Sequence, residues 1–188
     1  MRLFVALDIP ETILHSLAKL SRQFQAICPR ARWVRLDGAH LTLKFIGETP
    51  PDRAERILAA LRQTPTAGPV ELCFAGLGFF PDTRRPRVLW AGIETSAALR
   101  ALAASIETQL EPLGIPRETR EFQPHITLAR FDSPKRLEPL RTAVEKLGLP
   151  EFGRATAEEF HLYQSVLKRG GAEYTRLATY RLSGEPAS

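Results

Sequence analysis

The chain contains one short pattern twice, HLTLKF at residues 40–45 and HITLAR at residues 125–130. In both copies a threonine follows the histidine two positions later, and apolar residues stand between and after them. Because successive side chains of a β-strand point to opposite faces, this alternation predicts two half-buried strands, each with a His and a Thr on its outward face. The copies begin 85 positions apart in a chain of 188 residues, so two similar halves are predicted.

The rest of the chain alternates between segments typical of strands and of amphipathic helices. Helices are predicted near residues 10–27, 54–61, 99–113 and 137–147, and strands near 2–9, 28–38, 40–48, 70–81, 86–93 and 125–131. The segment 158–182 has two β-rich runs around Gly170 and Gly171, which predicts a hairpin. No low-complexity linker divides the sequence, so we expect residues 1–188 to form a single domain with two lobes.

The composition is that of a globular protein able to bury a core, with 44% hydrophobic and 25% charged residues. A net charge of +5 favours polyanions such as nucleic acids or phosphate esters only weakly, and a GC-biased genome explains the excess of Arg over Lys equally well. Cys28 and Cys73 are far apart, which indicates a reducing compartment without a disulfide. The apolar start at residues 1–10 is too short for a signal peptide or a membrane span, so we expect a cytoplasmic protein.

The paired His and Thr suit the chemistry of phosphodiesters. Displacement at phosphorus needs a base for the attacking oxygen and an acid for the leaving oxygen, and histidine can serve as either near neutral pH. Threonine hydroxyls can hold the non-bridging oxygens. No metal is required, and two histidines without a third spaced ligand make a poor zinc site. The other histidines, His15 and His161, lack this context and are interpreted as structural or surface residues.

Two His-x-Thr strands about half a chain apart resemble the 2H phosphoesterase superfamily. The chain is most similar to its RNA 2′,3′-cyclic phosphodiesterases, historically called 2′-5′ RNA ligases. The resemblance extends over nearly the whole chain, through MRLFVALDIP, HLTLKFIGE, RPRVLWAGI, LEPLGIPRETREFQPHITLAR, EFHLYQS and the strand of Tyr174. It implies an α+β fold with two lobes of antiparallel β-sheet flanked by helices. The lobes would be related by a pseudo-two-fold axis around a central cleft, with one motif from each lobe.

The resemblance also implies a reaction, the hydrolysis of RNA 2′,3′-cyclic phosphate ends to 2′-phosphomonoesters without a cofactor. His40 would be the proton donor and His125 the proton acceptor, and Thr42, Thr127 and Arg130 would bind the phosphate. The residues alone do not say which histidine is the acid. Simple alternation turns Arg130 away from His125, so Arg130 needs a β-bulge to reach phosphate and is otherwise a salt-bridge residue at the rim. The expected partner is RNA, and the expected state is a monomer.

Several alternatives stay open at this point. The same site would join RNA ends by a 2′-5′ linkage if a 5′-hydroxyl replaced water, and a non-catalytic RNA-binding module is a rival of a different class. Lys44 shares the predicted face of His40 and either reaches phosphate or is a solvated strand residue. The basic loop with Arg84, Arg85 and Arg87 either contacts the RNA backbone or is a solvated turn. Phe4 and Trp33 either stack on a base or belong to the core.

Overall fold

The computed structural model of the protein describes residues 1–168 and 171–184, and within them the strands form two antiparallel sheets. The first sheet has the order β3-β1-β8-β9 and the second the order β2-β6-β5-β4-β7. The strands are β1 (Arg2–Asp8), β2 (Arg32–Trp33), β3 (His40–Glu48), β4 (Val70–Phe80), β5 (Val88–Ile93), β6 (His125–Arg130), β7 (Glu151–Ala157), β8 (Glu159–Lys168) and β9 (Gly171–Arg181). The helices are α1 (Glu11–Ile27), α2 (Pro51–Arg62), α3 (Ala97–Leu110), α4 (Glu138–Leu147) and the 3-10 helix η1 (Glu111–Leu113).

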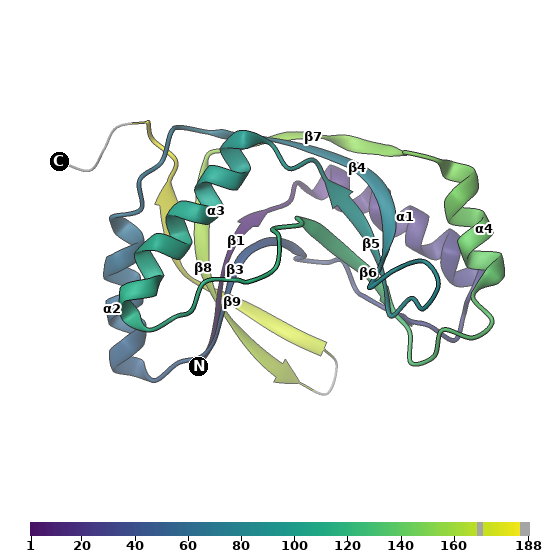
Figure 1. The fold of residues 1–188 in the computed structure, drawn as a ribbon, viewed down its shortest axis with the longest axis horizontal. Coiled ribbons are helices and arrows are strands. Elements are labelled where there is room, and N and C mark those ends of the chain that lie inside the picture. Colours follow the sequence, from purple (N-terminus) through teal and green to yellow (C-terminus); the bar gives the residue numbers. More distant parts are fainter. Residues whose placement is uncertain (169–170, 185–188) are drawn as a thin grey trace.

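The helices flank the two sheets in pairs (Figure 1). Helices α2 and α3 pack on each other and against strands of the first sheet, whereas α1 packs on α4 and against β7 of the second sheet. Each helix buries an apolar stripe at helical spacing; in α1 this stripe includes Ile13, Leu17 and Phe24. The resulting core is continuous between the sheets and the helices.

The chain order shows an internal repeat that the sequence shows only faintly. The unit β1-α1-β3-α2 corresponds to the unit β5-α3-β6-α4. In each unit the first strand pairs antiparallel with the His-x-Thr strand, and the helix between them packs on the other sheet. The predicted fold class, two antiparallel sheets flanked by helices in two related halves, is confirmed.

The predicted elements are confirmed with one omission. Strand β7 was not predicted, because its sequence EFGRATA has few apolar residues. It is an edge strand, and its pairing with β4 rather than a hydrophobic pattern makes it a strand. The predicted hairpin is present as the antiparallel pair β8 and β9, whose last described pair is Lys168 with Gly171. Its turn, with Gly170, lies outside the described residues.

Two expectations about the chain as a whole are also met by the described part of the structure. Cys28 and Cys73 are both free, as expected for a chain without a disulfide. Within residues 1–168 and 171–184, no helix has the length and apolar character needed to cross a membrane.

Candidate active site

Strand β3 presents His40 and Thr42 on the face that points away from the main core. The pairing with β1 shifts by one residue after Thr42, so Leu43 is an extra residue and forms a β-bulge. Beyond the bulge the alternation is reversed. Phe45 joins the face of His40 and is 52% exposed, whereas Lys44 points inward and is 4% exposed.

Strand β6 repeats this arrangement in the second sheet. His125 and Thr127 share its outward face, and the pairing with β5 also shifts by one residue after the threonine, which makes Leu128 the extra residue. Ala129 is therefore turned inward and fully buried, and Arg130 lies exposed on the face of His125. The bulge that Arg130 needed in order to share that face is present, at the same position in both motifs.

The two motif strands approach each other from different sheets. Strand β3 is the edge of the first sheet, and β6 is followed in the second sheet only by the two-residue strand β2. Cα atoms of β3 and β6 come within 8 Å of each other, and Figure 1 shows both strands in the middle of the molecule. Neither His40 nor His125 is fully buried. The structure therefore brings the two motifs to the junction between the sheets.

The carboxylate of Asp8 is the centre of a polar cluster beside His40. Its Oδ1 lies 3.8 Å from Nε2 of His40 and accepts a 2.6 Å hydrogen bond from the hydroxyl of Tyr163. Its Oδ2 contacts the guanidinium of Arg176 and lies 3.5 Å from Nε2 of His161. Three strands supply the groups around His40, namely β1, β8 and β9, so the cluster connects the motif strand to the rest of the first sheet.

The surroundings of His40 disfavour its charged form. Burial lowers the pKa of His40 below its ordinary value of 6.5, and the positive charges of Arg176 and His161 lower it further, while the Asp8 carboxylate opposes them. Burial also lowers the pKa of His161. Burial and hydrogen bonding to Asp8 raise the pKa of Tyr163 to about 12, so its hydroxyl remains a donor.

The ring of His125 is fixed in a different way. Its Nδ1 lies 2.7 Å from the carbonyl oxygen of Gln123, a distance at which Nδ1 carries the hydrogen and donates it. The edge of the ring meets Phe80, with ring centroids 4.9 Å apart. With Nδ1 engaged, Nε2 of the neutral ring is left with a free lone pair.

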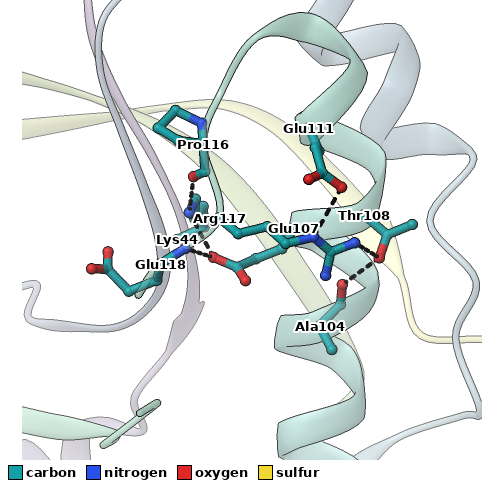
Figure 2. A network of polar contacts seen from close by, with 8 residues as sticks. All are labelled: Lys44, Ala104, Glu107, Thr108, Glu111, Pro116, Arg117 and Glu118. Atoms are coloured by element: carbon teal, nitrogen blue, oxygen red, sulfur yellow. Dashed lines mark hydrogen bonds and ion pairs between the residues drawn. The ribbon is translucent and has the colours of Figure 1, made fainter. Parts of the chain in front are cut away.

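Lys44 corrects an expectation from the sequence, because it neither reaches the outward face nor is solvated. Its Nζ forms a 2.6 Å ion pair with Glu107 of α3 and donates a 2.7 Å hydrogen bond to the carbonyl oxygen of Pro116 (Figure 2). Glu107 also accepts a 2.8 Å hydrogen bond from the backbone N–H of Glu118. Although burial raises the pKa of Glu107, the bonds from Lys44 and Glu118 hold it below its usual range. Lys44 thus ties β3 to α3 and to the segment that leads into β6.

The remaining candidates from the sequence fall outside the two motifs. Trp33 is half-buried and donates a hydrogen bond to the carbonyl oxygen of Cys28, which is a structural role, and Phe4 is only 4% exposed. His15 lies exposed on α1, and His161 is buried, with Nδ1 3.0 Å from the hydroxyl of Thr179. The loop residues Arg84, Arg85 and Arg87 are exposed, so their contact with RNA stays a prediction. Among the residues described, no three His, Cys, Asp or Glu side chains are grouped to hold a metal ion.

Sequence reasoning missed the cluster around Asp8 and the exposed aromatic side chain of Phe45. The available signal was weak: Asp8 ends the first predicted strand, and Tyr163 and Arg176 alternate with apolar residues in theirs. Their convergence depends on the strand order β3-β1-β8-β9, in which neighbours in space are far apart in the chain. No local pattern predicts that order.

Comparison with solved structures gives the class of protein that this fold and these motifs define. A crystal structure from Thermus thermophilus superposes with a TM-score of 0.78 at 31% identity, covering 97% of this chain and 98% of that one. Escherichia coli LigT, complexed with 3′-AMP, superposes with a TM-score of 0.77 at 26% identity over the same shares of the two chains.

The sequence comparisons give the family. Residues 13–169 match the 2′-5′ RNA ligase superfamily, to which the chain therefore belongs. A relative from Archaeoglobus fulgidus, named RNA 2′,3′-cyclic phosphodiesterase, is 32% identical over 181 residues, which are 96% of this chain and 99% of the relative. One of the same name from Methanocaldococcus jannaschii is 31% identical over 174 residues, 93% and 96% of the two chains. The family predicted from the two motifs is thereby confirmed.

Proposed function

We propose that the protein hydrolyses RNA 2′,3′-cyclic phosphate ends to 2′-phosphomonoesters, with His40 and His125 as an acid–base pair. One observation carries the proposal: two strands from different sheets, with β-bulges at the same position, each present a His and a Thr on the outward face where the strands approach. The names of the relatives, which match nearly the full chain, support the cyclic phosphate as substrate.

His125 is the general base in this proposal. The hydrogen bond from its Nδ1 to the carbonyl oxygen of Gln123 selects the tautomer whose Nε2 can accept a proton. Nε2 takes a proton from water as the water oxygen bonds to phosphorus. The same backbone carbonyl then stabilises the imidazolium that forms.

His40 is the general acid. It gives a proton to O3′ as the bond between phosphorus and O3′ breaks, while the ester to O2′ remains, so the product is the 2′-phosphomonoester. The anionic phosphate diester and the Asp8 carboxylate, 3.8 Å from Nε2, both favour the protonated ring against the effect of burial. The acid is thus charged chiefly when substrate is bound.

Thr42, Thr127 and Arg130 hold the phosphate in this proposal. Each shares the face of a histidine, so hydroxyl and guanidinium donors converge with the two rings. Donors fixed in advance stabilise the negative charge that grows on the non-bridging oxygens. These side chains and the two imidazoles account for the reaction without a metal ion.

A product assay tests the proposal. Purified protein is incubated with adenosine 2′,3′-cyclic phosphate, and 2′-AMP is separated from 3′-AMP by chromatography. We expect 2′-AMP, and we expect His40→Ala and His125→Ala each to lower the rate at least about 10²-fold, because each removes a proton-transfer group. The matched control is His15→Ala, an exposed histidine on α1 whose loss leaves the rate unchanged.

The same assay separates the proposal from its rivals. Formation of 3′-AMP, or full activity in both histidine variants, would reject the assigned roles. Loss of the wild-type activity in a strong chelator would reject a metal-free reaction. RNA fragments with a cyclic phosphate and a 5′-hydroxyl test ligation, and joined RNA in excess over 2′-phosphate would make ligation the main reaction.

A further inference from the structure

Two aromatic side chains beside His40 are exposed, although the aromatic side chain between them is buried. Phe45 of β3 is 52% exposed and Tyr174 of β9 is 46% exposed, whereas Phe4 of β1 is 4% exposed. The rings of Phe4 and Phe45 are stacked with centroids 5.9 Å apart, and Tyr174 meets Phe4 edge-on at 5.5 Å. We refer to Phe4, Phe45 and Tyr174 as the aromatic platform.

The platform adjoins the proposed acid. The ring centroids of His40 and Tyr174 are 5.3 Å apart, and those of His40 and Phe4 are 6.0 Å apart. The bulge at Leu43 is the reason for this placement, since without it Phe45 would face the core. Exposing two large rings is unfavourable in water, so their position next to a reactive group suggests a ligand surface.

Cationic groups flank the platform. The guanidinium of Arg2 lies 5.6 Å from the centre of the Phe45 ring, and that of Arg176 lies 5.7 Å from the centre of the Tyr163 ring. Aromatic faces next to positive charges are the combination that binds single-stranded nucleic acid, by stacking on the base and attracting the phosphates. A purely apolar partner would gain nothing from these charges.

We infer that the platform binds the nucleobase of the 3′-terminal nucleotide, the one that carries the cyclic phosphate. The inference rests on the proposed function, because it needs the phosphate beside His40. Base and phosphate are attached to the same ribose, so a phosphate at the histidines leaves the base only a few bonds away, where Phe45 and Tyr174 are exposed. Stacking uses the π-face that every base has, so all four bases bind, purines more tightly than pyrimidines.

Kinetics with and without a base test this inference. The two substrates are adenosine 2′,3′-cyclic phosphate and methyl riboside 2′,3′-cyclic phosphate, in which a methoxy group replaces the base. We expect Phe45→Ala and Tyr174→Ala each to raise KM for the adenosine substrate about 10-fold, the effect of losing one stacking contact. For the methyl riboside substrate, kcat/KM stays within about twofold of wild type, since there is no base to lose.

Two controls accompany the kinetics. Tyr174→Phe keeps the ring and retains the wild-type KM, and Leu149→Ala removes a side chain that is 86% exposed outside the platform and changes neither substrate. Equal losses on both substrates in Phe45→Ala and Tyr174→Ala would mean that the rings only support the site, and unchanged kinetics would place the base elsewhere. Either result overturns the inference.

A binding measurement separates failure of the inference from failure of the proposed function. The probe is 2-aminopurine riboside 2′-phosphate, whose fluorescence is quenched when the base stacks. Quenching by wild type and its loss in Phe45→Ala support the platform even if wild type hydrolyses neither substrate, in which case the proposed hydrolysis fails alone. Wild-type protein that binds the probe without quenching, or does not bind it, refutes the platform.

Discussion

Two copies of one motif give their histidines unlike environments. His40 lies next to a carboxylate and two positive groups, whereas His125 donates to a backbone carbonyl. An acid–base pair needs two groups with different proton affinities, and here the difference comes from the neighbours and not from the motif. The assignment of acid and base, open from the residues alone, therefore becomes testable through those neighbours.

Arg176→Gln tests which histidine is the acid. The positive charge of Arg176 lowers the pKa of His40, so its removal raises that pKa. If His40 must be protonated, the alkaline limb of the pH profile of kcat/KM moves to higher pH, and Asp8→Asn moves it to lower pH. The control Arg100→Gln, an exposed residue of α3 paired with Glu121, leaves the profile in place. A shift of the acidic limb instead would make His40 the base.

Arg130 is predicted to bind phosphate through its guanidinium. Arg130→Ala should lower kcat/KM about 10²-fold, because a charged donor to the transition state is lost. Arg130→Lys should recover only part of it, since an ammonium lacks the planar fork that matches two phosphate oxygens. Arg154→Ala on the edge strand β7 is the matched control. An Arg130→Ala variant as active as this control would leave Arg130 a rim residue.

At the scale of elements, the bulges decide which side chains reach the site. One extra residue in β3 turns Lys44 inward and Phe45 outward, and one in β6 turns Arg130 outward. Lys44 then bonds Glu107 and Pro116, so β3, α3 and the segment entering β6 are held together by one buried cation. A side chain that resembles a phosphate ligand in sequence is in this structure an internal support.

Lys44→Met should lower the free energy of unfolding by about 3 kcal/mol, because it leaves the Glu107 carboxylate without its cation. Urea unfolding at pH 7 measures this. The control Lys168→Met breaks an ion pair with Glu173 whose side chains are more than half exposed, and should cost less than about 1 kcal/mol. Adding Glu107→Leu to Lys44→Met should recover part of the loss. Equal stability of the two lysine variants would contradict the support role.

The whole molecule is held together by a chain that passes repeatedly between two sheets. Strands β1, β3, β8 and β9 belong to one sheet, and the segments between them supply the other. The face of the first sheet that carries the site contains two histidines near one carboxylate, both disfavoured in their charged form. Stability of the whole fold is therefore linked to their protonation.

Acid should destabilise the protein before its carboxylates titrate. The pKa values of His40 and His161 are lowered below 6.5, so between those lowered values and pH 6.5 the unfolded chain binds more protons than the folded one. The free energy of unfolding should thus be highest above pH 6.5 and fall below it. Urea unfolding between pH 5 and 8 measures the slope, which His161→Asn should reduce. A flat profile across this range would argue against the linkage.

Much of the fold and part of the site could be predicted because they depend on local patterns. Alternation placed His40, Thr42, His125 and Thr127 on outward faces, and helical spacing placed the four long helices. Strict alternation failed for Lys44, because a bulge depends on pairing with a neighbouring strand and leaves no mark in the strand itself. Strand β7 was missed for the same reason.

The sequence by itself determined the elements, the two motifs and the family, since each is set by the order of residues along a short stretch. Only the tertiary structure decided that Asp8, His161, Tyr163 and Arg176 gather beside His40 and that Phe45 and Tyr174 adjoin the same ring. Those contacts join strands separated by most of the chain, and their geometry follows from strand order and from single-residue shifts of register. Both are properties of packing between segments, which no one segment contains.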